Sequence, residues 1–180
     1  MGAILVLPLP GAEPAALERL ALEIEAVLHR PAWVGDPVRN VDIAYDPGRD
    51  QYNSRRLLEL LRGMVPEGVD RVLGVTHLDL FVPVLTFVFG EAQLEGPAAV
   101  VSSFRLDNRF YGLPDAAATL QARLEKEAIH ELGHTYGLLH CTDQLCVMRS
   151  STYVEQIDLK RRTFCMDCGR IILAPFPPGS

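Results

Sequence analysis

The stretch EAIHELGHTYGLLHCTDQLCVM, residues 127–148, contains three histidines, and a glutamate directly follows the first of them. Apolar residues recur at every fourth position from residue 120 and predict a helix over Asp115–His134. On that helix His130 and His134 lie one turn apart, so both imidazoles project from the same face. Glu131 lies about 100° round the helix axis from His130. This arrangement is typical of two zinc ligands with a general base beside them.

His140 can complete this ligand set only if the chain reverses after His134. On a continuous helix His140 would lie about 15 Å beyond His130 and on a different face. Gly137 allows the reversal, because glycine adopts left-handed conformations at little cost and commonly ends helices. Three histidines would leave a fourth coordination position for water, as in catalytic zinc sites. Zinc lowers the pKa of bound water to about 7, and Glu131 would take the proton as the water attacks a peptide carbonyl.

The chain has four cysteines, and all of them follow the third histidine. Two residues separate Cys165 from Cys168, a spacing typical of zinc knuckles, and four residues separate Cys141 from Cys146. In a reducing compartment such clustered pairs bind metal more often than they form disulfides. The four thiolates are therefore expected to close a tetrahedral structural zinc site. Two disulfides, or reduced cysteines in the core, are the alternatives.

The sequence before the histidines predicts strands that alternate with helices. Gly2–Pro8 is continuously apolar, as in a strand that is buried on both faces. The alternation predicts an α/β (α+β) fold with a mainly parallel sheet, and the last strands, which no helix separates, add an antiparallel edge. The other elements expected are strands over Val41–Tyr45, Val69–Val75, Leu85–Phe89 and Ala98–Leu106, and helices over Glu13–Arg30 and Ser54–Met64, with Ser54 as the N-cap.

The sequence after His134 is expected to be less regular. Val154–Phe164 predicts one short helix, and the closing IILAPFPPGS should be extended because it is rich in proline. No linker and no internal repeat divides the chain. We expect one domain over residues 1–180, with an upper sheet–helix subdomain over about residues 1–137 and a lower, irregular subdomain over about residues 138–180.

Composition limits the expected partners of this protein. The 180 residues carry a formal net charge of -6 and a pI near 5.3, so there is no general basic field for nucleic acid or anionic membranes. No apolar run is long enough to span a membrane, and the initial MGAILVLPLP lacks the charged region of a signal peptide. We expect a cytoplasmic protein, and a monomer because no coiled-coil pattern is present.

The stretch HELGHTYGLLHC fits HExxHxxGxxH, the signature of metzincin metallopeptidases. Its continuation, CTDQLCVM and then CMDC, resembles the archaemetzincin family, as do QYNSRRLL, VLGVTHLDLFVPVLTFVFG and AVVSSFRL upstream. The resemblance implies a metallopeptidase with two Zn2+ ions, one catalytic and one structural. The residues that it implies are the catalytic zinc ligands His130, His134 and His140, the general base Glu131, the Met-turn methionine Met148, and the structural zinc ligands Cys141, Cys146, Cys165 and Cys168.

The same resemblance implies a metzincin-like twisted sheet over an active-site helix. Its edge strand, expected near Ala98–Ser103, would flank the substrate cleft. The chain departs from the family pattern in the spacer Arg149–Phe164, whose sixteen residues are one fewer than the pattern has.

Three functions stay open on the sequence alone. The complete histidine–glutamate–glycine array favours a zinc-dependent peptidase, with aminopeptidase and endopeptidase activity both compatible. A zinc-dependent endoribonuclease-like hydrolase is the second, because a family of bacterial endoribonucleases has three histidines at similar spacing, although it lacks a counterpart of Glu131. The third is a non-catalytic zinc protein that binds peptides.

Overall fold

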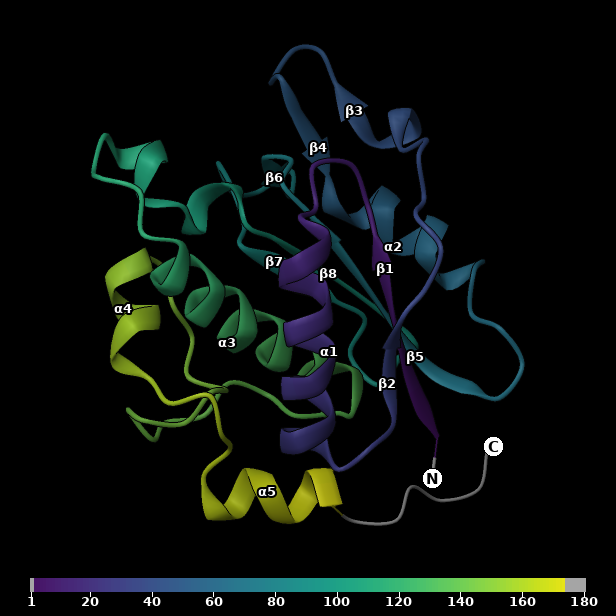
Figure 1. Ribbon diagram of the computed structural model, residues 1–180, viewed down its shortest axis with the longest axis vertical. Coiled ribbons are helices and arrows are strands. Elements are labelled where there is room, and N and C mark those ends of the chain that lie inside the picture. The colour runs from purple at the N-terminus through teal and green to yellow at the C-terminus, as the bar shows by residue number, and fades with distance from the viewer. Residues whose placement is uncertain (1, 174–180) are drawn as a thin grey trace.

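The fold is built on a five-stranded sheet. The computed structural model describes residues 2–173, and the strands of this sheet run in the order β2-β1-β5-β8-β7. Neighbouring strands are parallel except for β7, which pairs antiparallel with β8 at one edge (Figure 1). The expected α/β fold with an antiparallel edge strand is confirmed. The strands cover Ala32–Val34 (β2), Ala3–Pro8 (β1), Val69–Thr76 (β5), Ala98–Ser102 (β8) and Gly90–Ala92 (β7).

Helices cover both faces of this sheet, because its central strands are apolar on both sides. In β1, Ile4 and Val6 belong to one hydrophobic core, while Leu5 and Leu7 belong to the other. Alternate side chains of a strand point to opposite faces, so a continuous apolar run requires two covering layers. The first core is covered by α1 (Pro14–Leu28) and α3 (Ala117–Thr135), and the second by α2 (Ser54–Arg62).

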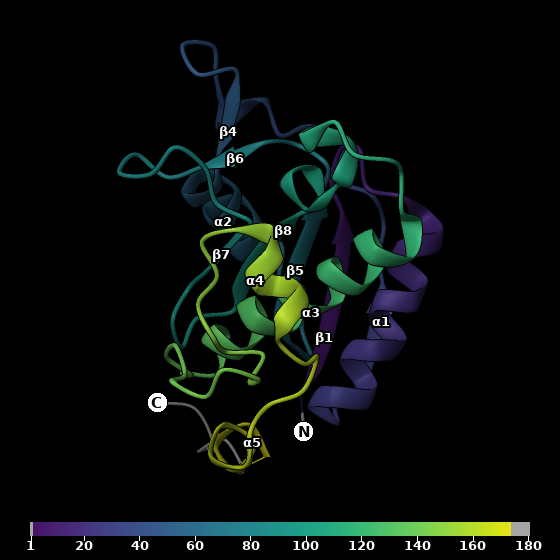
Figure 2. The ribbon, with the colours of Figure 1, turned by 90° about the vertical axis from the view of Figure 1, so that its left-hand side faces the viewer.

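A small second sheet and a helical C-terminal region complete the described chain. The small sheet has the order β3-β4-β6 and lies at the top of Figure 1. Helix α4 packs against α3, and α5 lies below both of them (Figure 2). Within residues 2–173, no helix combines the length and the apolar character needed to cross a membrane. These elements are β3 (Tyr45–Asp46), β4 (Gln51–Asn53), β6 (Leu80–Phe81), α4 (Val154–Leu159), α5 (Met166–Leu173) and the 3-10 helices Asp42–Ala44, Phe104–Leu106 and Asn108–Tyr111.

Two strand predictions were wrong, and a third strand was predicted at the wrong place in the sheet. The segment Val41–Tyr45 contains the 3-10 helix Asp42–Ala44, and the buried residues of the segment, Val41 and Ala44, are three apart rather than two. The predicted strand over Leu85–Phe89 is a loop, and a single bridge at Val88 joins it to β6. The run near Ala98–Ser103 is the internal strand β8, and the edge is β7. Strands β7 and β2 have three residues each, too few to show a pattern.

Helix ends also differ from expectation. Asn53, not Ser54, caps α2, because the Asn53 side chain accepts a hydrogen bond from the Arg55 amide. The predicted helix over Val154–Phe164 ends at Leu159. The first residues of the closing segment belong to α5 instead of being extended, and its remainder lies outside the described residues.

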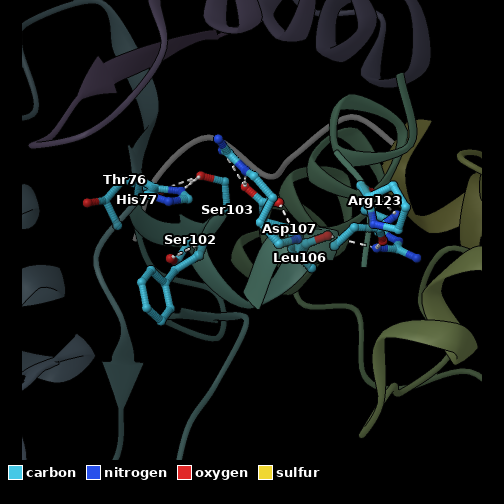
Figure 3. A network of polar contacts seen from close by, with 11 residues as sticks. Thr76, His77, Ser102, Ser103, Leu106, Asp107 and Arg123 are labelled. Carbon is cyan, nitrogen blue, oxygen red and sulfur yellow. Dashed lines mark hydrogen bonds and ion pairs between the residues drawn. The ribbon is translucent and has the colours of Figure 1, made fainter. Parts of the chain in front are cut away.

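A network of polar contacts ties α3 to the sheet (Figure 3). The buried guanidinium of Arg123 donates to the carbonyl oxygen of Leu106 over 2.8 Å and pairs with Asp158 of α4 over 2.7 Å. Nearby, His77 Nδ1 lies 2.8 Å from the hydroxyl of Ser103, so this histidine has a structural partner. The Arg123 contacts hold α3, the helix that carries the first two histidines of the cluster, against the segment after β8 and against α4.

Candidate metal centres and active site

The three histidines converge at the C-terminal end of α3. The helix ends at Thr135, and Gly137 adopts a φ of 89°, so the expected chain reversal is confirmed. As a result, the His140 ring centroid lies 5.3 Å from that of His130 and 5.0 Å from that of His134. One nitrogen from each ring can be chosen so that all three lie within 4.8 Å of one another.

Hydrogen bonds fix the protonation of two of these rings. His130 Nδ1 donates to the carbonyl oxygen of Val147 over 2.9 Å, and His134 Nδ1 donates to that of Leu138 over 2.6 Å. A carbonyl oxygen only accepts, so both Nδ1 atoms carry the proton and both Nε2 atoms carry a lone pair. The two Nε2 atoms lie 3.1 Å apart. Two facing lone pairs at this distance repel each other unless a cation lies between them.

The donor set therefore fits zinc. With metal–nitrogen bonds of about 2.0 Å, tetrahedral ligand atoms lie about 3.3 Å apart, close to the spacing of the two Nε2 atoms. Burial lowers the pKa of His130 well below its ordinary value, and it also lowers the pKa of His134 and of His140. All three rings are thus held in the neutral form that binds metal.

Glu131 lies beside the histidines and is almost fully buried. Burial is the main cause that raises its pKa well above the ordinary value, and the neighbouring Glu127 carboxylate raises it further. Sequence reasoning placed Glu131 at the edge of the histidine face, and the structure places it in the wall of two cavities that also reach His130 and His140.

These two cavities form a cleft along the edge of the sheet. The larger, which we name the cleft cavity, has a volume of about 350 Å³. The other has a volume of about 320 Å³ and runs along β7 and past His134. The cleft cavity is lined by residues 85–89 of the loop before β7, by Gly90 of β7, by Glu127, His130 and Glu131 of α3, by His140, and by residues 150–152.

The four cysteines form a second cluster, and their sulfur atoms lie within 4.8 Å of one another. The sulfurs of Cys141 and Cys165 are 3.8 Å apart, too far for a disulfide, and all four thiols are free. A tetrahedral site with metal–sulfur bonds of about 2.3 Å places its sulfurs about 3.8 Å apart. Burial raises the pKa of Cys146 and of Cys168, so a bound cation is needed to hold these two as thiolates. The cluster fits a structural zinc ion.

Met148 is fully buried, and its side chain lies against Gly133, inside the histidine motif. A Cβ atom added at Gly133 would collide with the Met148 sulfur, and it would also lie 3.3 Å from the Phe164 ring. The glycine inside HELGH is therefore required by this close approach, a role that sequence reasoning missed because the contact joins α3 to a distant turn.

Replacing Gly133 with alanine should destabilise the fold by about 1–3 kcal/mol, since the added methyl must displace the Met148 side chain. Denaturant unfolding of the two proteins measures this difference. Gly169→Ala in α5 is the matched control, because its Cβ would meet nothing closer than 4.0 Å. Equal stability of Gly133→Ala and the parent would contradict the packing argument.

Sequence reasoning also missed an ion pair beside the cleft. Lys160 Nζ lies 2.8 Å from Glu127 Oε1, and the Lys160 side chain has no exposed surface. Neither residue belongs to a recognisable motif, so only the folded chain brings them together. Two tyrosines after residue 110 are not placed to stabilise an oxyanion: Tyr153 is exposed, and Tyr111 donates to the Arg105 carbonyl. Neither lines the two cavities of the cleft.

Comparison with known proteins agrees with this site. The model of peptidase family M54 matches residues 17–173. The chain belongs to peptidase family M54. An archaemetzincin from Methanocaldococcus jannaschii is 46% identical over 125 residues, which are 69% of this chain and 68% of the relative. Another, from Methanopyrus kandleri, is 47% identical over 129 residues, which are 72% of this chain and 70% of that relative. The archaemetzincin resemblance is confirmed.

Solved structures extend the match over nearly all of this M54 chain. The crystal structure of the Methanopyrus kandleri archaemetzincin aligns with a TM-score of 0.81 and 35% identity, covering 94% of this chain and 93% of that one. A zinc-dependent peptidase from Methanocorpusculum labreanum aligns with a TM-score of 0.84 and 31% identity, covering 93% and 99%. This M54 member is a zinc-dependent metallopeptidase, and its two clusters suit a catalytic and a structural zinc ion.

Proposed function

We propose that His130, His134 and His140 hold the catalytic zinc ion and that Glu131 is the general base of peptide-bond hydrolysis. The observation that carries this proposal is the pair of lone-pair-bearing Nε2 atoms 3.1 Å apart, with a buried carboxylate in the same cleft. Metal ligands, base and substrate cavity then occupy one edge of the sheet.

In this proposal the protein's own residues transfer the proton and orient the metal ligands. When bound, zinc would polarise the scissile carbonyl and acidify a water molecule. Glu131 accepts a proton from the attacking water and returns it to the nitrogen of the leaving amine. Its raised pKa brings its proton affinity closer to what both transfers need. The carbonyls of Val147 and Leu138 keep the rings of His130 and His134 oriented throughout.

The second zinc ion has a structural role in this proposal. The four cysteines are its ligands, and Met148 forms an apolar floor beneath the histidines. Hydrogen bonds link both clusters to the adjacent residues Val147 and Met148, which supports one domain over residues 1–180, with upper and lower subdomains over about residues 1–137 and 138–180. One such bond runs from the Cys141 amide to the Met148 carbonyl over 2.9 Å.

Peptides are the substrates of this family. We infer that RNA is not a substrate, because the cleft cavity is lined by Glu127 and Glu131 and, within the described chain, by no lysine or arginine. Four thiolate ligands need reducing surroundings, which supports the cytoplasm as the location. A monomer is proposed because the site is formed by residues of a single chain.

The experiment that tests the activity is digestion of a diverse peptide library, read by mass spectrometry. The zinc-loaded protein should yield defined product ends that disappear when a chelator is added. Those ends also distinguish an aminopeptidase from an endopeptidase. Single-stranded RNA incubated in parallel should stay intact. RNA cleavage without peptide cleavage would overturn the proposal.

Removing one catalytic ligand should remove one metal ion. Replacing His134 with alanine is expected to reduce the zinc content from about two ions to about one per chain and to abolish peptide cleavage. The unfolding temperature should change by only a few degrees, because the cysteine cluster is intact. Metal analysis and calorimetry on one preparation measure both effects. A variant that keeps two zinc ions would contradict the ligand assignment.

A further inference from the structure

The cleft cavity has apolar walls and an acidic polar end. The walls come from Leu85, Phe87, Val88 and Phe89. The charged side chains that line it are carboxylates only, and hydroxyl groups at residues 150–152 lie on the remaining side. A cavity with this division suits a side chain that has a long apolar stem and a cationic end.

The apolar wall is held in place from behind. Arg49 donates to the carbonyl oxygen of Leu85 over 3.0 Å, and the Gln51 side chain donates to that of Thr86 over 2.9 Å. The Arg105 guanidinium lies 4.4 Å from the Phe87 ring centroid. These contacts fix a loop that is otherwise without regular structure, so the cavity is formed before a substrate arrives.

Glu127 keeps acceptor capacity at the polar end. Lys160 pairs with its Oε1 atom over 2.8 Å and also donates to the carbonyl oxygen of Arg149 over 3.0 Å. A carboxylate offers about four acceptor positions on two oxygens. Within residues 2–173, the buried Oε1 atom of Glu127 has no hydrogen-bond partner beyond its ion pair with Lys160, and the buried hydroxyl of Ser151 in the same cavity has none either. Buried polar oxygens without partners are costly, and donors supplied by a ligand would satisfy them.

We propose that the cleft cavity is a specificity subsite for a lysine or arginine side chain of the substrate, next to the scissile bond. The inference rests on the proposed function. The aliphatic stem lies between the Phe87 wall and α3, and the cationic end donates to Glu127 and to Ser151. Lys160 holds the Glu127 carboxylate in place from its buried side, and it does not line the cavity itself.

Peptides that differ at one position test this subsite. The residues that flank the scissile bond are varied among arginine, lysine, norleucine and glutamate, and kcat/KM is measured for each. At one flanking position the protein should prefer arginine or lysine over norleucine by about tenfold or more, the effect of one buried charge-assisted hydrogen bond. Glu127→Gln should reduce this ratio to near one, and Glu155→Gln, at an exposed position of α4, should preserve it. Equal cleavage of the arginine and norleucine peptides by the parent would overturn the proposal.

A double variant distinguishes loss of the subsite from loss of the fold. Glu127→Gln alone leaves Lys160 buried beside a neutral group, so Glu127→Gln combined with Lys160→Met removes both charges at similar volume. This double variant should fold and should also lose the preference for basic residues. A preference that persists in the folded double variant would exclude Glu127 as its source.

Peptide binding separates this inference from the proposed function. Glu131→Gln with zinc bound should bind the arginine peptide about tenfold more tightly than the norleucine peptide. If the parent cleaves no peptide but this preference in binding remains, the proposed function fails and the subsite stands. If the parent cleaves peptides and the variant binds both equally, the subsite fails and the proposed function stands.

Discussion

Replacing Glu131 with glutamine is expected to lower kcat for peptide cleavage by about 10³-fold, the usual contribution of a general acid–base group. Glutamine keeps the size of the side chain but cannot accept and return a proton. The histidines keep their carbonyl partners, so both zinc ions should stay bound. Stopped peptide digests give the rate, and metal analysis of the same sample gives the zinc content.

The control for this variant is an exposed carboxylate on a neighbouring helix. Glu155 lies on α4 and does not line the cleft, so Glu155→Gln should keep the parent rate. A Glu131→Gln protein that binds two zinc ions and still cleaves peptides at the parent rate would assign the proton transfers to another group.

The histidine site was predictable because its geometry is local. Ligands four residues apart on a helix share a face whatever surrounds the helix. The placement of His140 needed only one further inference, that Gly137 ends the helix, and its φ of 89° agrees. The contacts between distant segments were not predictable in the same way. Glu127 and Lys160 meet because α4 packs on α3, and Gly133 is constrained by a methionine from a later turn.

The strands of the sheet were also predictable only where the pattern lies within the strand itself. The long buried strands β1 and β5 were predicted because each carries enough apolar residues to show a pattern. The edge strand β7 was missed, since Gly90, Glu91 and Ala92 form a strand only through pairing with β8. That pairing brings β7 to the cleft, where its three residues line one of the two cavities, so an element of the cleft wall carried a weak sequence signal.

The cysteine cluster is joined to the three clustered histidines through a short path of hydrogen bonds. The Cys141 amide donates to the Met148 carbonyl over 2.9 Å, and the Val147 amide donates to the Thr163 carbonyl over 3.1 Å. The Val147 carbonyl in turn accepts from His130. A change in the cysteine cluster should therefore reach a catalytic ligand without touching it directly.

Replacing Cys168 with serine is accordingly expected to affect stability and activity together. The zinc content should fall by about one ion per chain, and the unfolding temperature should fall by about 10 °C or more. A structural zinc site contributes several kcal/mol to the free energy of unfolding, and each kcal/mol corresponds to about 2–4 °C in unfolding temperature at this chain length. Limited proteolysis should then cleave the chain within the segment that follows residue 140, because α5 and the loop before α4 are no longer held together by a shared zinc ion. Cleavage of peptides should decline even though all three histidines remain.

Two comparisons test whether the cysteine cluster holds a structural zinc ion: one with the His134→Ala variant, and one with the parent protein treated with a reducing agent. Each variant loses one zinc ion, but only Cys168→Ser should lose stability on this scale, which separates a structural metal from a catalytic one. A thiol reductant should leave the parent unchanged, since its cysteines are free, whereas a strong chelator should reproduce the Cys168→Ser unfolding temperature. An unfolding temperature that is lowered by the reductant but not by the chelator would instead indicate disulfides, and the cysteine cluster would then not be a metal site.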